Sequence, residues 1–241
     1  MIKLNCDMGE GMPYDSQIMP LVDMANLACG LHAGSPELMR ENILLAQVHG
    51  VEVGAHPSYP DREHFGRLSM TLPDQELVAL LQYQIGGIDA ICRANGMKLS
   101  YVKPHGALYN DMMRDATLFE RIIRAVASYD TKLRVMILSS GRNAEYATIA
   151  SRYGITLLYE LFADRNYTNE GALVPRSHPE AVIEDVSQIV ERIRHYLSYG
   201  ELITLEGQSL KLAGDSLCVH GDNEASLAVI VALRDVLRAM G

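Results

Sequence analysis

Short apolar runs alternate along this chain with longer amphipathic segments, and this alternation constrains the fold more than any other feature of the sequence. Several of the runs are continuously apolar, which is typical of strands buried on both faces of a parallel sheet. We expect seven strands, at residues 2–5, 26–29, 51–55, 99–103, 133–138, 155–161 and 217–219. Because a helix between two strands returns the chain to the same end of the sheet, this order predicts a parallel arrangement.

The segments between the expected strands carry signals for helix ends. Ser35, Pro36 and Glu37 have the residue types of an N-cap, a first helical position and an acidic first turn, and the helix that they open stops at Gly50. Further helices are expected over residues 73–95, 116–128, 143–153, 180–199 and 225–240. In residues 201–212 the alternation of apolar and polar side chains differs from that of the barrel segments, and this pattern predicts a β-hairpin arm.

The number of repeated units bounds the architecture. Seven β-α units in 241 residues fit a single domain over residues 1–241 better than two small domains. The sequence therefore predicts an α/β fold of the (β/α) barrel type with seven strands. An open, doubly wound parallel sheet is the competing architecture. In both folds the carboxyl ends of the strands point to one face, and active sites lie there.

Composition argues against several classes of function. The formal net charge of −9 would repel nucleic acid, and no run of Lys or Arg offers a basic patch. No stretch of about 18 uncharged apolar residues occurs, so no membrane span is expected, and the first residues do not resemble a signal peptide. The four cysteines form no C-x-x-C pair, which argues against a structural zinc site and a disulfide scaffold and favours a cytoplasmic setting.

Polar and charged side chains follow six of the seven expected strands, at the point where each strand ends. Each residue alone has an ordinary explanation, such as a helix cap or a solvated loop position. Together they predict a functional site, because a parallel β/α fold would bring them to one pocket. The candidates are Asn5, Asp7, Glu10, His32, His56, Lys103, His105, Tyr109, Asn110, Glu160, Asp164, Arg165, His220 and Asp222.

This set of residues could support two kinds of chemistry. Carboxylates and imidazoles could act as general base and acid on a carbonyl, with Lys103 or Arg165 stabilising a developing oxyanion. Alternatively, zinc or another divalent ion could be held by ligands drawn from Asp7, His32, His56, His105, His220 and Asp222. The chain contains no H-E-x-x-H or other metal signature of fixed spacing, so a transition metal is not the expected interpretation.

Seven segments, most of them at the expected strand ends, carry distinctive motifs. They are NCDMGEG at 5–11, ACGLHAG at 28–34, GAHPSYPD at 54–61, KPHGALYN at 103–110, FADR at 162–165, LVPR at 173–176 and CVHGDN at 218–223. In order and over nearly the whole chain, these motifs resemble the LamB/YcsF family. The sequence departs from the family at four positions: the family has Phe, Asp, Gly and Pro, respectively, where this chain has Leu31, Ser35, His64 and Glu224. These departures flank the polar positions.

The resemblance implies a barrel of the glycoside hydrolase/deacetylase type and a subunit that works together with partner subunits B and C. The implied reaction is the ring opening of 5-oxoproline to L-glutamate, coupled to hydrolysis of ATP that is bound with Mg²⁺. Phosphorylation of the amide oxygen would activate the lactam, and Lys103, Arg165 and Arg176 could bind the anions. The chain contains no P-loop motif, so ATP would be bound in another way or by a partner.

The expected roles divide the candidate residues into two groups. The predicted catalytic group consists of Asp7, Glu10, Lys103, His105 and Asp222, and the sequence does not rank the possible bases among them. The predicted substrate-binding group consists of Asn5, His32, His56, Tyr109, Asn110, Glu160, Asp164, Arg165, Arg176 and His220. The alternative functions are a stand-alone metal-dependent amidohydrolase or carbohydrate deacetylase, and a non-catalytic subunit that presents substrate. Assembly of the chain into a homo-oligomer is compatible with each of these functions.

Overall fold

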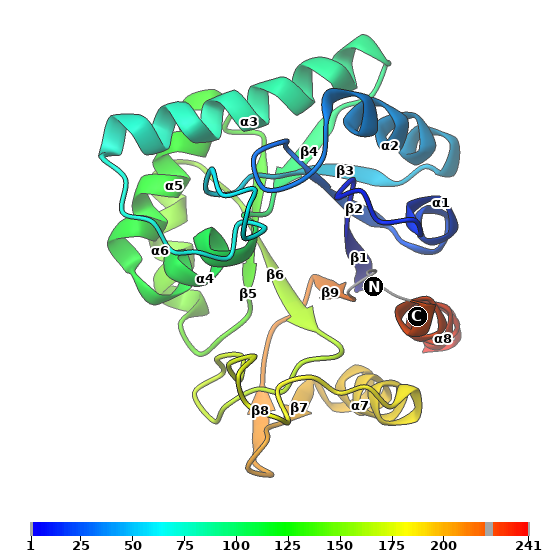
Figure 1. Ribbon diagram of the computed structural model, residues 1–241. Coiled ribbons are helices and arrows are strands. Elements are labelled where there is room, and N and C mark those ends of the chain that lie inside the picture. Colours follow the sequence, from blue (N-terminus) through cyan, green and yellow to red (C-terminus); the bar gives the residue numbers. More distant parts are fainter. Residues whose placement is uncertain (1, 220–223, 241) are drawn as a thin grey trace.

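Seven parallel strands close into a barrel in the computed structural model of the chain, which describes residues 2–219 and 224–240 (Figure 1). Within these residues the order is β1-β2-β3-β4-β5-β6-β9, and β9 pairs with both β6 and β1. The strands are Lys3–Met8 (β1), Met24–Ala28 (β2), Glu52–His56 (β3), Leu99–Val102 (β4), Arg134–Leu138 (β5), Leu157–Phe162 (β6) and Ser216–Cys218 (β9). Because every barrel strand has two neighbours, the predicted (β/α) barrel is confirmed and the open doubly wound sheet is excluded.

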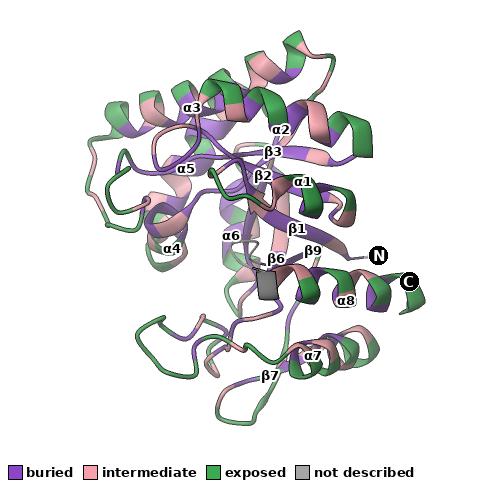
Figure 2. Ribbon diagram, turned by 45° about the vertical axis from the view of Figure 1, so that its right-hand side comes forward, coloured by how far each residue is buried: buried purple, intermediate pink, exposed green. Residues whose placement is uncertain are grey.

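Helices surround the barrel, and α2 (Pro36–His49) has the ends that its sequence signals predict. The Ser35 hydroxyl accepts a hydrogen bond from the backbone N–H of Leu38, and Gly50 adopts the left-handed conformation that ends the helix. The other helices near their predicted bounds are α3 (Asp74–Ala94), α5 (Ala116–Tyr129), α6 (Asn143–Ser151) and α8 (Glu224–Met240). Their outer faces are exposed, whereas the strands that they cover are buried (Figure 2).

The helix α7 (Val186–Tyr199) is shorter than predicted, because the sequence places its start at residue 180. The residues before it form extended structure instead, with antiparallel bridges from Arg165 to Val182 and from Tyr167 to Leu173. The helix begins where the Asp185 side chain accepts a hydrogen bond from the Gln188 backbone N–H. Val182, the apolar residue that continues the predicted helix face upstream of this cap, lies in the extended segment and is exposed.

Short helices near the strand ends were not predicted. α1 (Asp15–Ile18) and a 3-10 turn (Met19–Leu21) follow β1, and α4 (Gly106–Arg114) starts four residues after β4 ends. Gly106 has φ 56°, and a Cβ there would lie 2.5 Å from the carbonyl oxygen of Gly66. This close approach holds the loop that follows β3 against the start of α4, and only glycine permits it.

A β-hairpin lies beside α7, within the segment for which the sequence predicts one (Figure 1). Its strands β7 (Glu201–Ile203) and β8 (Ser209–Lys211) pair antiparallel. The backbone N–H of Leu205 donates to the carbonyl of Tyr167 at 3.0 Å, which joins the hairpin to the loop that follows β6. Among the described residues, no helix has both the length and the apolar character needed to cross a membrane.

The barrel lumen changes character along its axis. At the amino ends of the strands, Lys3 and Arg134 both form ion pairs with Glu52. A small apolar layer of Met24, Tyr101 and Met136 lies buried apart from the main core. Polar side chains dominate at the carboxyl ends, as described below. The main apolar core therefore lies between the strands and the helices. The charged side chains at the two ends of the strands lie inside the barrel lumen.

Candidate functional site

A cavity of about 380 Å³ lies at the carboxyl ends of the barrel strands. Residues from the ends of β1, β3, β4 and β6 and from the loop that follows β6 form its walls. The predicted site residues that line it are Asp7, Glu10, His56, Lys103, His105, Tyr109, Asn110, Arg165 and Arg176. The strand-end cavity is thus in the position at which parallel β/α barrels hold their active sites.

Asp7 and Lys103 in the wall of the strand-end cavity form a charge triad with Glu160, which lies behind that wall. The Nζ of Lys103 lies 2.9 Å from Oδ1 of Asp7 and 2.8 Å from Oε1 of Glu160. These residues come from β1, from the residue after β4 and from β6, so the charges meet across the lumen. The Lys103 side chain is 3% exposed and that of Glu160 is fully buried, which makes the triad an ion network inside the barrel.

The electrostatics of the charge triad keep Asp7 and Lys103 ionised. Burial alone lowers the pKa of Lys103, but the carboxylates of Asp7 and Glu160 outweigh it and raise that pKa well above its usual value. Burial raises the pKa of Asp7, but the charges of His56 and Lys103 outweigh it and hold that pKa well below its usual value. Asp7 therefore carries a negative charge at neutral pH.

A layer of hydrogen bonds beneath the charge triad fixes the Asp7 carboxylate. The Asn26 amide donates to Oδ1 of Asp7 at 2.7 Å and to the Asn5 side-chain oxygen at 2.8 Å. The Tyr101 hydroxyl donates to the Asn26 side-chain oxygen at 2.7 Å. Asn26 and Tyr101 were not predicted from the sequence, because both lie inside apolar strands. Tyr101 stands two positions before Lys103, so strand alternation could have placed its side chain on the same face.

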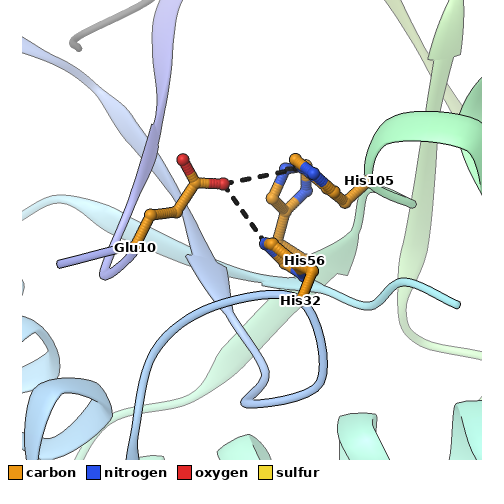
Figure 3. A group of neighbouring side chains, drawn as sticks. All are labelled: Glu10, His32, His56 and His105. Carbon is orange, nitrogen blue, oxygen red and sulfur yellow. Dashed lines mark hydrogen bonds and ion pairs between the residues drawn. The ribbon is translucent and has the colours of Figure 1, made fainter. Parts of the chain in front are cut away.

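Glu10, His32, His56 and His105 form an imidazole cluster (Figure 3). The cluster lies next to the charge triad, because His56 contacts Asp7. The rings of His32 and His105 stack with centroids 3.8 Å apart. Oε1 of Glu10 lies 3.2 Å from Nε2 of His32 and 3.6 Å from Nδ1 of His105. Nε2 of His56 lies 2.9 Å from Nδ1 of His105 and 3.4 Å from Oδ2 of Asp7, which links the two groups of side chains.

Burial sets the charge states in the imidazole cluster. It lowers the pKa of His32 and of His105 to about 3, and the neighbouring His56 adds to this effect in both cases. Both rings are therefore neutral at physiological pH. Burial raises the pKa of Glu10, and the nearby Asp7 carboxylate raises it further. The cluster thus offers neutral imidazole nitrogens beside a carboxyl group.

The loop that follows β3 shapes the imidazole cluster from above. Phe65 has φ 57°, a left-handed conformation that is uncommon outside glycine, and its carbonyl oxygen accepts a hydrogen bond from Nε2 of His105 at 2.9 Å. A Cβ on Gly66 would lie 2.9 Å from the ring of His105 and 3.0 Å from Cβ of His32. The strained loop therefore fits tightly against two of the imidazoles.

Arginines contribute positive charge to the wall of the strand-end cavity. Arg165 is buried, with its Nε donating to the carbonyl of Ala181 at 3.1 Å and its Nη2 to the carbonyl of Val174 at 2.6 Å. Burial and the neighbouring guanidinium of Arg176 lower the pKa of Arg165. Two guanidinium groups that repel each other in one wall form a favourable place for an anion.

The remaining predicted residues take different positions. Asn5, His32 and Glu160 lie directly behind the cavity wall, in contact with Lys103 or His105. Asp164 is half-buried and, among the described residues, does not belong to the wall. His220 and Asp222 lie outside the described residues, so their predicted roles as ligand or base have no structural description. The cavity brings most of the candidates together, and their roles stay predictions.

Comparison with known proteins gives this geometry a family. The model of the LamB/YcsF family matches residues 2–241. The chain belongs to the LamB/YcsF family. The motifs of this LamB/YcsF chain that end β1, β3 and β4 supply Asp7, Glu10, His56, Lys103 and His105 to the charge triad and the imidazole cluster. The resemblance read from the sequence is therefore confirmed.

Relatives of this LamB/YcsF chain are similar over nearly their full length. A Vibrio parahaemolyticus protein, named as the A subunit of 5-oxoprolinase, is 45% identical over 245 residues, covering 100% of this chain and 97% of the relative. A Pseudomonas fluorescens protein of the same name is 45% identical over 239 residues, covering 97% of this chain and 96% of the relative. A crystal structure described as a lactam utilization protein from Thermus thermophilus has a TM-score of 0.90 and 37% identity, and the match covers 99% of this chain and 96% of that one.

Proposed function

We propose that this LamB/YcsF chain is the A subunit of a 5-oxoprolinase, which opens the ring of 5-oxoproline to give L-glutamate. The observation that carries the proposal is the 45% identity, over the whole chain, to relatives that bear this name. The reaction is coupled to ATP hydrolysis in a complex with subunits B and C. The amide carbonyl of a lactam is a poor electrophile, and phosphorylation of its oxygen by ATP makes attack by water feasible.

The strand-end cavity has features that suit a small anionic lactam. Its volume of about 380 Å³ lies within the range of small-molecule sites. The ammonium of Lys103 is already shared by Asp7 and Glu160, so the substrate carboxylate or a transferred phosphoryl group fits better against Arg165 and Arg176. Lys103 then serves to hold Asp7 in its ionised form and fixed orientation.

The geometry also ranks the candidate bases. Asp7 is paired with an ammonium group and receives an amide hydrogen bond, so its carboxylate is a weak proton acceptor. Glu10 faces imidazoles rather than a Lys or Arg side chain, and its raised pKa makes it the stronger base. His105 uses its Nε2–H for the carbonyl of Phe65 and is held neutral by burial. We therefore assign proton removal from the attacking water to Glu10.

Reconstitution tests the proposed function. The full chain is mixed with folded subunits B and C, and glutamate formation is measured with 5-oxoproline, ATP and Mg²⁺ present or omitted one at a time. We expect turnover only in the complete mixture. Glutamate formation without ATP, or no turnover by the complete mixture of folded subunits, would contradict the assignment.

The imidazole cluster favours one alternative function, a metal-dependent amidohydrolase or carbohydrate deacetylase that works alone. Neutral histidines beside a carboxylate are the ligands of catalytic metal sites in such enzymes. Under this alternative the isolated chain hydrolyses lactam or N-acetyl substrates without ATP or partner subunits. An assay of the isolated chain with 5-oxoproline and with an N-acetylated sugar, without ATP or subunits B and C, distinguishes the two functions, because only the alternative predicts activity of the chain alone.

A further inference from the structure

Two imidazole nitrogens in the imidazole cluster face each other at 2.9 Å, and backbone carbonyls bind the other nitrogen of each ring. Nδ1–H of His56 donates to the carbonyl of Lys103 at 2.7 Å, so the neutral ring carries its lone pair on Nε2. Nε2–H of His105 donates to the carbonyl of Phe65 at 2.9 Å, so the neutral ring carries its lone pair on Nδ1. Carbonyl oxygens only accept hydrogen bonds, and they assign both tautomers. The two lone pairs then lie 2.9 Å apart and repel each other unless a positive charge joins them.

The surroundings of these two nitrogens carry an excess of negative charge. Oε1 of Glu10 points at the imidazoles, and Oδ2 of Asp7 lies 3.4 Å from Nε2 of His56. The ammonium of Lys103 pairs with Asp7 at 2.9 Å and with Glu160 at 2.8 Å. Three carboxyl groups thus share one ammonium group in this part of the described structure. A cation with more charge than a proton would balance them better.

We propose that the imidazole cluster binds one divalent transition-metal ion, such as Zn²⁺, through Nε2 of His56, Nδ1 of His105 and Oε1 of Glu10. His32 is the fourth member of the site. One candidate ligand atom from each of the four residues lies within 4.8 Å of the others. A small inward movement of these side chains would bring the atoms to the separations of roughly 3–4.4 Å that ligands bound at about 2.0–2.2 Å to one ion have. The carbonyls that hold His56 and His105 supply the outer hydrogen bonds that orient metal-binding imidazoles.

The donor set also selects the type of ion. Imidazole nitrogens with one carboxylate suit zinc and neighbouring transition metals, whereas Mg²⁺ prefers oxygen ligands and retains its water. The Mg²⁺ that accompanies ATP is therefore not expected at this site. The proposal that the cluster binds an ion does not depend on the proposed 5-oxoprolinase function. The role of the bound ion in catalysis does rest on that function. A bound ion supplies a Lewis acid that lowers the pKa of water, and Glu10 keeps Oε2 to accept the proton.

Metal binding by the isolated full chain tests the proposal without substrate, ATP or partner subunits. The chain is stripped with chelator and dialysed, and then titrated with Zn²⁺ by calorimetry and with Co²⁺ by its visible absorption. We expect one ion per chain and no detectable binding of Mg²⁺. In His56→Gln and His105→Gln the affinity for Zn²⁺ falls by at least about 100-fold. His49→Gln removes an exposed histidine at the end of α2 and leaves the affinity unchanged.

Circular dichroism and thermal unfolding establish that each variant is folded. If a histidine variant does not fold, Glu10→Gln takes its place, because the amide keeps the shape of the carboxyl group and removes its charge. A stripped wild-type chain that takes up no Zn²⁺ or Co²⁺ would overturn the proposal, and so would equal affinity in the wild type and the folded variants. Neither result bears on ATP-dependent turnover in the reconstituted complex, which tests the proposed function separately.

Discussion

Lys103 organises the charges of the strand-end cavity. It lies between Asp7 and Glu160, and its side chain is almost completely buried. Removing one partner from a buried ion network leaves the others without compensation, which costs more than the network contributes when it is intact. The stability of the folded chain should therefore depend strongly on this one ammonium group.

We predict that Lys103→Met lowers the free energy of unfolding by about 3–5 kcal/mol, because two buried carboxylates lose their cation. Urea denaturation followed by circular dichroism measures the change. Lys98→Met, at an exposed position, serves as the control and should change stability by less than about 0.5 kcal/mol. Equal effects of the two substitutions would show that the charge triad does not need its ammonium.

Glu10 and Asp7 are predicted to differ in their effect on turnover. Glu10→Gln should lower kcat of the reconstituted complex by roughly 10²–10⁴-fold while the KM for 5-oxoproline changes little, because the general base is lost. Asp7→Asn should also disturb Lys103, so it should reduce both kcat and the thermal stability of the chain. A Glu10→Gln enzyme with wild-type kcat would exclude Glu10 as the base.

At the scale of elements, β3 shows how the lumen restricts side-chain size. Gly54 faces the ring of Tyr101, and a Cβ at Gly54 would lie 2.2 Å from that ring. The Tyr101 hydroxyl holds Asn26, which in turn holds Asp7, so crowding at β3 should be felt at the strand-end cavity.

We predict that Gly54→Ala destabilises the chain by about 1–3 kcal/mol, because the ring must move from a fully packed position. Gly87→Ala is the matched control: it lies in α3, where a Cβ meets nothing within 4 Å, and alanine should stabilise the helix by about 0.5–1 kcal/mol. Thermal unfolding of both variants measures the changes. The same sign for both would contradict the role of the Tyr101 ring.

The sequence predicts the elements well where a local signal fixes their ends. α2 has its predicted bounds because Ser35 and Gly50 mark them chemically. The predicted start of α7 was wrong because an apolar periodicity continues upstream of its true cap at Asp185. α4 was missed because the close approach of Gly66 to Gly106 depends on tertiary contacts that no local pattern records.

The sequence predicted which residues lie in the candidate site, but not which of their side chains contact one another. The strand-end rule indicated Asp7, His56 and Lys103, and the closed barrel brings them together. Which imidazole nitrogen faces which carboxylate depends on the register of the strands and on backbone carbonyls, such as that of Phe65. The sequence alone therefore could not choose among the bases or show the stacked histidines.

At the scale of the whole molecule, the amino end of the barrel contributes a pH-dependent term to stability. Burial raises the pKa of Glu52, but its contacts with Lys3 and Arg134 outweigh burial and lower that pKa below its usual value. A carboxylate with a lowered folded-state pKa stabilises the protein above its unfolded-state pKa, and the stabilisation is lost as the pH falls through the folded-state value. These contacts join β1, β3 and β5 across the lumen.

We predict that Glu52→Gln lowers the free energy of unfolding by about 1 kcal/mol near neutral pH, and that the difference from wild type disappears in strong acid. Urea denaturation at a series of pH values measures this difference. Glu41→Gln, at an exposed position on α2, should give a curve parallel to that of the wild type. A pH-independent difference for Glu52→Gln would mean that the ion pairs do not stabilise the barrel.

The closing strand β9 also limits when the chain can fold during its synthesis. β9 pairs with β1, more than 200 residues earlier in the chain, and its Ser216 and Cys218 contact Asn5 and Lys103. A ribosome that has not yet released residue 218 holds a nascent chain with an open sheet and an unfinished lumen. Polypeptides cut short by premature termination upstream of β9 would thus expose sheet edges to their neighbours, and they are natural clients for chaperones or proteases.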